Sequence, residues 1–128
     1  MKTLIIGNNQ SINQAFSELM NEELACSFSF IDPCRIHNKK TPAELNADLI
    51  FIDLSSAIND SRDFVKNVRR LKPETPIIAL HFYKDMALIE EIMQAGASAY
   101  LLVNTSSSEL NNAIENILNG DTYISQDI

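Results

Sequence analysis

The chain has 128 residues, enough for one domain with a single core, and its hydrophobic content of 45% is ordinary for a globular protein. Its formal charge of −7, from 10 Lys and Arg against 17 Asp and Glu, argues against direct contact with a nucleic acid backbone. No apolar run approaches the roughly 18 residues of a membrane span, and the first ten residues do not form a signal peptide. The sequence therefore predicts a cytoplasmic domain without membrane contact.

The first part of the chain alternates strand and helix patterns. Residues 3–6 predict a short apolar strand, and apolar residues then recur at helical spacing, with Ser11 as the expected N-cap. Alternation over residues 25–30 predicts a half-exposed strand near a sheet edge. His37 falls in a polar loop and is expected at the surface. Residues 41–46, which begin Thr-Pro, predict a short helix.

The second part of the chain continues the same alternation. The run Leu49 to Ile52 has no polar residue and is typical of a strand covered on both faces, as in a parallel sheet. Ser106 and Glu109 predict a capping box, and Gly96 predicts a helix C-cap. The expected strands and helices after residue 48 cover residues 49–52, 64–71, 76–80, 85–95, 98–103 and 107–119. In all, five strands and about five helices predict an α/β fold.

Four stretches carry a family resemblance: "DLIFIDLSS", "PIIALH", "AGASAYLL" and "LNNAIENILNGDTYIS". With the order of elements, they resemble the receiver domain of two-component response regulators, which is CheY-like, and in particular its LuxR-type subgroup. The resemblance covers essentially the whole chain. It implies a flavodoxin-like three-layer sandwich with a five-stranded parallel sheet in the order 2-1-3-4-5. It also implies that residues 1–128 are one receiver-like domain, which is either free-standing or the N-terminal part of a longer chain with a C-terminal helix-turn-helix.

Asp53 ends the central strand, at the edge of a parallel sheet where ligands and chemistry are usually found. The resemblance implies that it is the phosphoacceptor candidate, a carboxylate that would take a phosphoryl group from a histidine kinase. A carboxylate attacking an anionic phosphoryl group needs a cation and a positive side chain around the transferring oxygens. Magnesium is therefore expected as a cofactor only if Asp53 is phosphorylated.

The sequence departs from the receiver pattern at the metal site. Gly7 and Asn8 stand where a typical receiver carries an acidic pair. Asn8 offers an amide oxygen and Ser55 a backbone carbonyl, but with Asp53 as the lone carboxylate these make a weak magnesium site. We expect no resident metal.

Two further positions of the receiver pattern have changed. His81 stands where a hydroxyl residue is expected, and Val103 stands where a lysine is expected, so the positive partner of the phosphoryl oxygens is missing. His81 is expected to fill the emptied pocket. Tyr100 occupies the switch position of receivers, and core packing is its expected role.

Asp53 thus has a structural interpretation beside the functional one, in which its side chain accepts hydrogen bonds from the backbone of Leu54 and Ser55. We predict an atypical receiver, not an enzyme, that works without phosphorylation through the face built from its fourth helix, fifth strand and fifth helix. A histidine kinase, an output domain of the same chain or a second copy is the expected partner.

Two alternatives come from other classes. One is a working phosphoacceptor at Asp53 that controls an attached DNA-binding domain. The other is a small flavodoxin-like enzyme or cofactor binder, which the stretch "IIGNNQS" does not favour because it lacks the glycine spacing that binds a pyrophosphate.

Overall fold

In the part of the chain that the structure describes, the central sheet has six strands, all parallel, in the order β2-β1-β3-β4-β5-β6. The computed structural model describes residues 1–23, 26–36, 41–56 and 60–126. The strands are β1 (Lys2–Ile6), β2 (Ser27–Ile31), β3 (Leu49–Asp53), β4 (Ile77–His81), β5 (Ala99–Leu102) and β6 (Tyr123–Ile124). The predicted α/β fold and the predicted order of the first five strands are confirmed.

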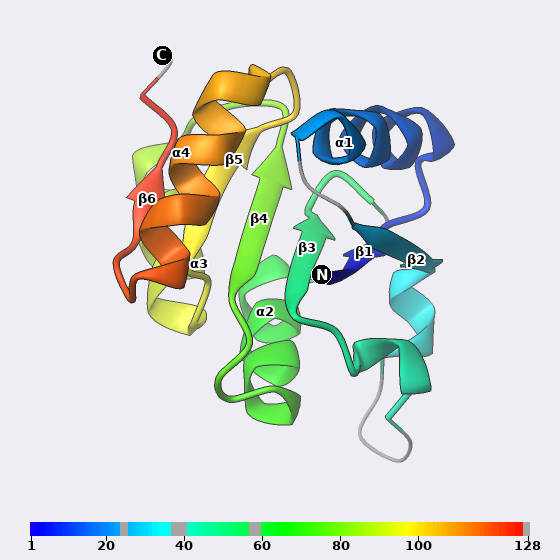
Figure 1. Ribbon diagram of the computed structural model, residues 1–128. Coiled ribbons are helices and arrows are strands. Elements are labelled where there is room, and N and C mark those ends of the chain that lie inside the picture. The colour runs from blue at the N-terminus through cyan, green and yellow to red at the C-terminus, as the bar shows by residue number, and fades with distance from the viewer. Residues whose placement is uncertain (24–25, 37–40, 57–59, 127–128) are drawn as a thin grey trace.

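Helices cover both faces of the sheet and make a three-layer sandwich (Figure 1). The α-helices are α1 (Gln10–Glu23), α2 (Ser61–Leu71), α3 (Met86–Ala95) and α4 (Ser107–Leu118), and two short 3-10 helices are η1 (Pro33–Arg35) and η2 (Ala43–Leu45). Helices α1 and α4 lie on one face of the sheet and α2 and α3 on the other. The sheet therefore separates two hydrophobic clusters.

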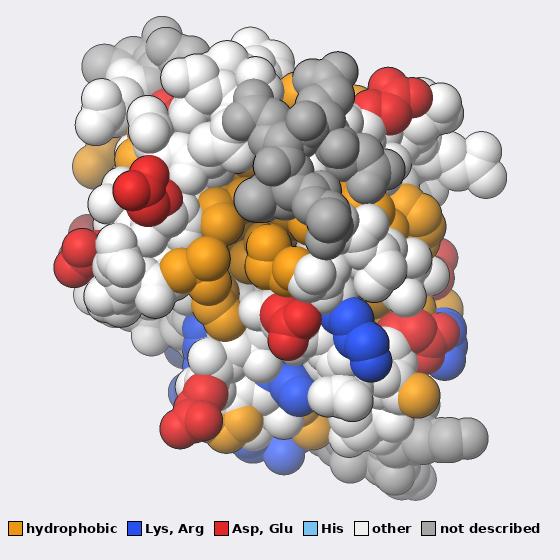
Figure 2. Space-filling view, in the orientation of Figure 1, with side chains coloured by type: hydrophobic (Ala, Val, Ile, Leu, Met, Phe, Trp, Pro, Cys, Tyr) orange, Lys and Arg blue, Asp and Glu red, His pale blue; other side chains and the backbone are white. Residues whose placement is uncertain are grey.

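Strand β3 lies at the centre of the sheet, and all five of its residues are buried. Alternate side chains enter the two clusters, so Phe51 packs on Phe16 of α1 with ring centroids 5.6 Å apart, while Ile50 and Ile52 enter the cluster under α2 and α3. Figure 2, seen from the side of α1 and α4, shows hydrophobic side chains gathered at the centre of that face. The buried run places Asp53 at the carboxyl edge of the sheet.

The sheet has one strand more than the sequence predicts. The backbone N–H of Tyr123 donates to the Ser98 carbonyl at 3.1 Å, and that of Ser125 donates to the Tyr100 carbonyl at 2.8 Å, which makes β6 a parallel neighbour of β5. A two-residue strand is too short to leave a periodic pattern, so the sequence does not reveal it.

The helices differ from the prediction in two places. The described residues contain four α-helices, because residues 41–46 form only the 3-10 turn η2. The predicted cap at Ser11 is wrong: Asn9 Oδ1 accepts from the Ile12 N–H at 3.1 Å, because the helix already begins at Gln10. The first predicted edge-strand residue, Ala25, and also His37 lie outside the described residues.

Candidate functional site

The candidate site is built around Asp53 at the carboxyl end of β3, and its side chain is fully buried. Strands β1 and β4 flank β3, so their ends bring Gly7 and His81 to the same edge of the sheet. The site therefore lies where parallel sheets usually place ligands and chemistry.

The hydrogen bonds of the Asp53 carboxylate come from the turn that follows it. Ser55 donates to Oδ1 twice, from its backbone N–H at 3.0 Å and from its hydroxyl at 2.5 Å, and the Ser56 hydroxyl donates to Oδ2 at 3.4 Å. The hydrogen bond from the Ser55 N–H to the Asp53 side chain is one that the structural interpretation of Asp53 predicts. The Leu54 N–H is not part of it, because that group donates to the Leu80 carbonyl at 2.8 Å.

Gly7 closes the site on the β1 side. A Cβ atom at this position would lie 2.9 Å from Asp53 Cβ and 3.3 Å from Ser56 Oγ, and the first of these distances is shorter than real side chains tolerate. An acidic residue does not fit here unless β1 and β3 move apart. Position 7 thus lacks both an acidic side chain and the space to hold one.

Asn8 contacts the site through its backbone, since its N–H donates to Ser56 Oγ at 3.0 Å. Hydrogen bonds from the Cys34 backbone N–H and then the Cys34 thiol lower the pKa of Asp32, burial raises it by less, and the smallest effect is a further lowering by a hydrogen bond from the Asn8 amide. The amide of Asn8 therefore donates a hydrogen bond to Asp32, the carboxylate that follows β2.

His81 ends β4 and is half-buried at the edge of the site. Its Nδ1 accepts from the Phe82 N–H at 2.8 Å, and its ring lies 4.3 Å from the ring of Tyr83. Burial lowers the pKa of His81, and the negative charge of Asp53 only partly opposes that shift. The imidazole is consequently neutral near pH 7, in contrast to a lysine ammonium.

Val103 and Tyr100 contribute packing. Val103 packs against the cluster under α1 and α4 and carries no charge to the site. Tyr100 is fully buried in the opposite cluster, and its hydroxyl donates to the Tyr83 carbonyl at 2.8 Å. Burial, with smaller effects from Tyr83 and Asp85, raises the pKa of Tyr100 to about 12. The arrangement agrees with core packing as the role of Tyr100.

The residues around Asp53 do not fit magnesium. The ion prefers near-octahedral oxygen ligands with one or two carboxylates, whereas here both Asp53 oxygens accept hydroxyl hydrogen bonds and Gly7 offers no side chain. Within the described ranges, no three His, Cys, Asp or Glu side chains come together as a metal cluster.

The sequence did not single out two buried polar residues beside Asp53. Ser56 links Asp53 to the Asn8 backbone, and Asn13 of α1 donates from Nδ2 to the Gly7 carbonyl at 3.3 Å. The Oδ1 atom of Asn13 is buried without a hydrogen-bond partner. One signal was present, because Asn13 stands next to Ile12 and three residues before Phe16, on the border of the apolar stripe of the helix.

None of the helices described is long and apolar enough to cross a membrane.

Solved structures with a similar fold include a response regulator and an isolated receiver domain. A LuxR-family two-component response regulator from Aurantimonas sp. superposes with a TM-score of 0.79 at 19% identity, covering 99% of this chain and 91% of the other. The isolated receiver domain of RcsB from Salmonella enterica, in the presence of phosphomimetic BeF3−, superposes with a TM-score of 0.80 at 16% identity over 98% and 94% of the two chains.

Sequence comparison finds transcriptional regulators. The transcriptional regulatory protein YdfI of Bacillus subtilis is 33% identical over 66% of this chain and 39% of its own length. The oxygen regulatory protein NreC of Staphylococcus epidermidis is 24% identical over 97% of this chain and 57% of its own length. No family model matches. The chain spans about half the length of the curated relatives it matches.

This chain has the fold of CheY-like receiver domains. Its structural neighbours are receivers of LuxR-family response regulators, and its relatives in sequence include regulators such as NreC and YdfI. The resemblance that the sequence indicated is thereby confirmed.

Proposed function

We propose that this receiver domain acts in two-component signalling as a protein interaction module that works without an aspartyl phosphate. The main support is the state of Asp53. This carboxylate is fully buried, its turn occupies its oxygens, and Gly7 leaves no room for a second acid. A group closed in this way cannot meet a phosphoryl donor without rearrangement of the turn.

Electrostatics give the second argument. The transition state of phosphoryl transfer spreads negative charge over three oxygens, which a metal ion and a positive side chain normally stabilise. In this site Val103 replaces the expected lysine, and the lowered pKa of His81 keeps its imidazole neutral. The charge-stabilising parts of the reaction are therefore missing.

The proposed partners are proteins: a histidine kinase, an output domain of the same chain, or a second copy. The surface proposed for them is the one around α3, β5 and α4. Large hydrophobic side chains are exposed beside these elements, with Met86 70% exposed at the start of α3 and Leu118 57% exposed at the end of α4. We further propose that a helix-turn-helix output domain follows residue 128 and that only this output domain contacts DNA. The proposed location is the cytoplasm. We propose no enzymatic activity and no cofactor.

Intact-mass spectrometry after incubation with acetyl phosphate and magnesium tests this function. The wild-type chain, the Asp53→Asn variant and a receiver with a complete acidic pair should be treated in parallel. We expect label on the complete receiver and none on this chain. One phosphoryl adduct on the wild type that the variant lacks would overturn the proposal.

A working phosphoacceptor is the second candidate, and one observation favours it. His81 is near enough to Asp53 for the charge of the carboxylate to act on its pKa, so a protonated imidazole could assist at low pH. If this candidate holds, labelling should increase as the pH falls through the lowered pKa of His81, and a His81→Ala variant should lose that increase.

A further inference from the structure

Beside Asp53, a hollow of about 540 Å³ lies between α1 and the ends of β1 and β2, and it shares Gly7, Asn8 and Asn13 with the candidate site. Its volume falls within the roughly 300–1,000 Å³ of small-molecule sites. Three kinds of group line it: the backbone of Gly7, a polar face of α1, and the side chains of Phe30 and Asp32. Apart from Gly7, none of these groups carries an argument for the function proposed above.

The α1 side of the hollow consists of neutral polar groups. Gln10, Asn13, Gln14 and Ser17 all line it, and their spacing of three and four residues puts them on one side of the helix. Amide groups offer donors and acceptors together. Asn13 is only 9% exposed, and its Oδ1 is the buried acceptor without a partner. Because that atom has almost no accessible surface, the exposed amides of Gln10 and Gln14 are the groups of α1 that can face a ligand.

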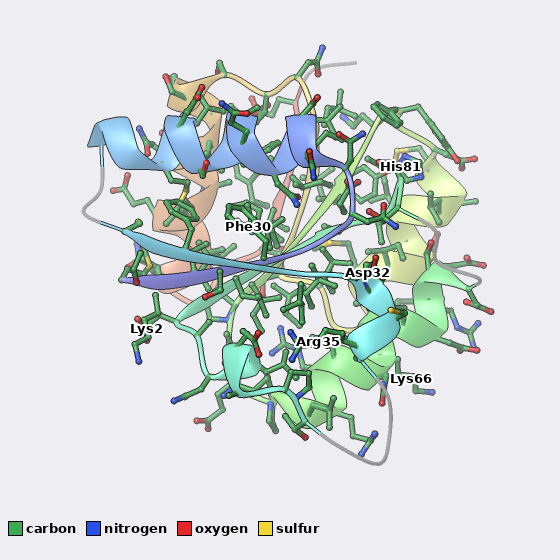
Figure 3. The ribbon with its side chains drawn as sticks, turned by 90° about the vertical axis from the view of Figure 1, so that its right-hand side faces the viewer. Lys2, Phe30, Asp32, Arg35, Lys66 and His81 are labelled. Atoms are coloured by element: carbon green, nitrogen blue, oxygen red, sulfur yellow. The ribbon has the colours of Figure 1, made fainter. Side chains whose placement is uncertain are left out.

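The β2 side supplies an aromatic ring and a carboxylate. Phe28, Phe30 and Asp32 alternate along β2 and its end, and the two rings are nearly parallel, 9° apart in plane with centroids separated by 6.4 Å. Phe30 is 46% exposed although it is a large aromatic residue. In Figure 3, Phe30 lies between α1 and β2, and Asp32 lies at the end of that strand. A flat ring in the hollow would thus meet both an aromatic surface and an acceptor.

Charge limits what the hollow can hold. Asp32 is the one ionisable side chain among its lining residues, and it is negative. The neighbouring cation Arg35 does not balance it, because its guanidinium pairs with both oxygens of Glu44 at 2.7 and 3.2 Å. A ligand with a phosphate would therefore meet repulsion without any compensating cation in the lining.

We propose that this hollow is a binding site for a purine base or its neutral nucleoside. The ring stacks on Phe30, an amide of α1 pairs with adjacent donor and acceptor atoms on the purine edge, and Asp32 accepts from an exocyclic amine. Asparagine and glutamine make this bidentate pairing with adenine in other proteins. The site would give the domain a small-molecule input that needs no phosphoryl transfer.

Titration of the isotope-labelled chain with adenosine, followed by NMR of the backbone amides, tests the site. We expect saturable shifts centred on residues 7–17 and 30–32. Phe30→Ala should weaken binding roughly fivefold to a hundredfold, the range measured when a stacking aromatic is removed. Phe82→Ala is the matched control, because Phe82 is a 59% exposed aromatic residue that does not line the hollow, and its affinity should equal that of the wild type.

Two further probes decide the ligand class. Adenosine monophosphate should bind more weakly than adenosine. The Asp32→Asn variant should show a smaller difference between its affinities for these two probes. Tighter binding of the phosphorylated probe, or shifts by glucose but not by adenosine, would overturn the proposal. So would equal affinity of the wild type and Phe30→Ala, or the absence of shifts in the lining residues. Because Asp53→Asn should bind adenosine normally, the outcome is independent of the phosphorylation experiment.

Discussion

One charged side chain at each end of the sheet has different kinds of hydrogen-bond partners. At the amino ends of β4 and β5, Arg69 of α2 donates to the carbonyls of Gly96, Lys72, Pro73 and Thr75 and to the Ser98 hydroxyl, at distances from 2.7 to 3.3 Å. At the carboxyl end of β3, the hydrogen bonds of Asp53 come from its own turn.

The difference indicates that the contacts at the amino ends of the strands stabilise the fold, whereas the carboxyl end of β3 carries the candidate site. The partners of Arg69 belong to the loop after α2, the end of α3 and the start of β5, so one guanidinium joins three segments. The Asp53 carboxylate makes no direct hydrogen bond to another segment, since its donors are Ser55 and Ser56 of its own turn. Four predictions test this contrast, beginning with the largest expected effect.

Arg69→Ala should lower the free energy of unfolding by about 2–4 kcal/mol, because it leaves several part-buried carbonyls without a donor. Urea denaturation measures the effect. Arg70→Ala is the control, since Arg70 is the exposed neighbour on the same helix and should change the stability little. Similar losses in the two variants would contradict a special role of the Arg69 cluster.

Gly7→Asp should destabilise the fold by roughly 1–3 kcal/mol, the usual cost of overpacking, because its Cβ would meet Asp53 Cβ at 2.9 Å. The added carboxylate also repels Asp53. Urea denaturation in EDTA should be repeated with Gly7→Ala, which keeps the steric conflict and omits the charge. If both variants match the wild type, the close approach of β1 and β3 is not a constraint on this site.

Glu109 is an acid with partners from several segments, and it extends the comparison. Burial raises its pKa, but hydrogen bonds from the Gln126 N–H, Thr105, Tyr123 and Ser125 outweigh that effect and lower it. A lowered pKa stabilises the fold above the unfolded value near 4.5, and this contribution is lost as the pH falls through the folded pKa.

Glu109→Gln should therefore reduce stability at pH 7 and flatten its decline between pH 5 and 3, as about one titrating group would. Chemical denaturation across this pH range gives the measurement. Glu115→Gln, an exposed acid on the same helix, serves as control. If stability depends on pH in the same way in Glu109→Gln as in the wild type, Glu109 does not stabilise the position of β6.

The smallest effect is expected from magnesium. Asp53 lacks a second acid, so millimolar magnesium should leave the melting temperature unchanged within error, whereas a receiver with the acidic pair should melt higher. Differential scanning calorimetry with and without EDTA provides the test. A clear rise for this chain would show a metal site and count against the contrast drawn here.

Much of the fold follows from local patterns in the sequence. The uninterrupted run of β3 predicts a buried central strand and places Asp53 at its end. Gly96 ends α3 with φ of 124°, and Ser106 Oγ accepts from the Glu109 N–H at 3.1 Å, both as the capping patterns indicate. These features depend on residues only a few positions apart, so a sequence is enough to find them.

The site could be predicted only in part. Its chemical deficits at Gly7, His81 and Val103 are visible in the sequence, because a missing acid or lysine is a change of residue type. The steric closure at Gly7 is not, since it depends on how closely β1 approaches β3. The same holds for the buried amide of Asn13.

The sequence by itself thus determined the order of the first five strands, the class of fold and the identity of the groups at the edge of the sheet. Tertiary structure alone decided the contacts between segments that are distant in the sequence. Arg69 reaches Gly96 across 27 positions, and Glu109 turns from the expected capping box to Gln126, 17 positions away. Such contacts have no local pattern, because they are fixed by the packing of separate elements around the core.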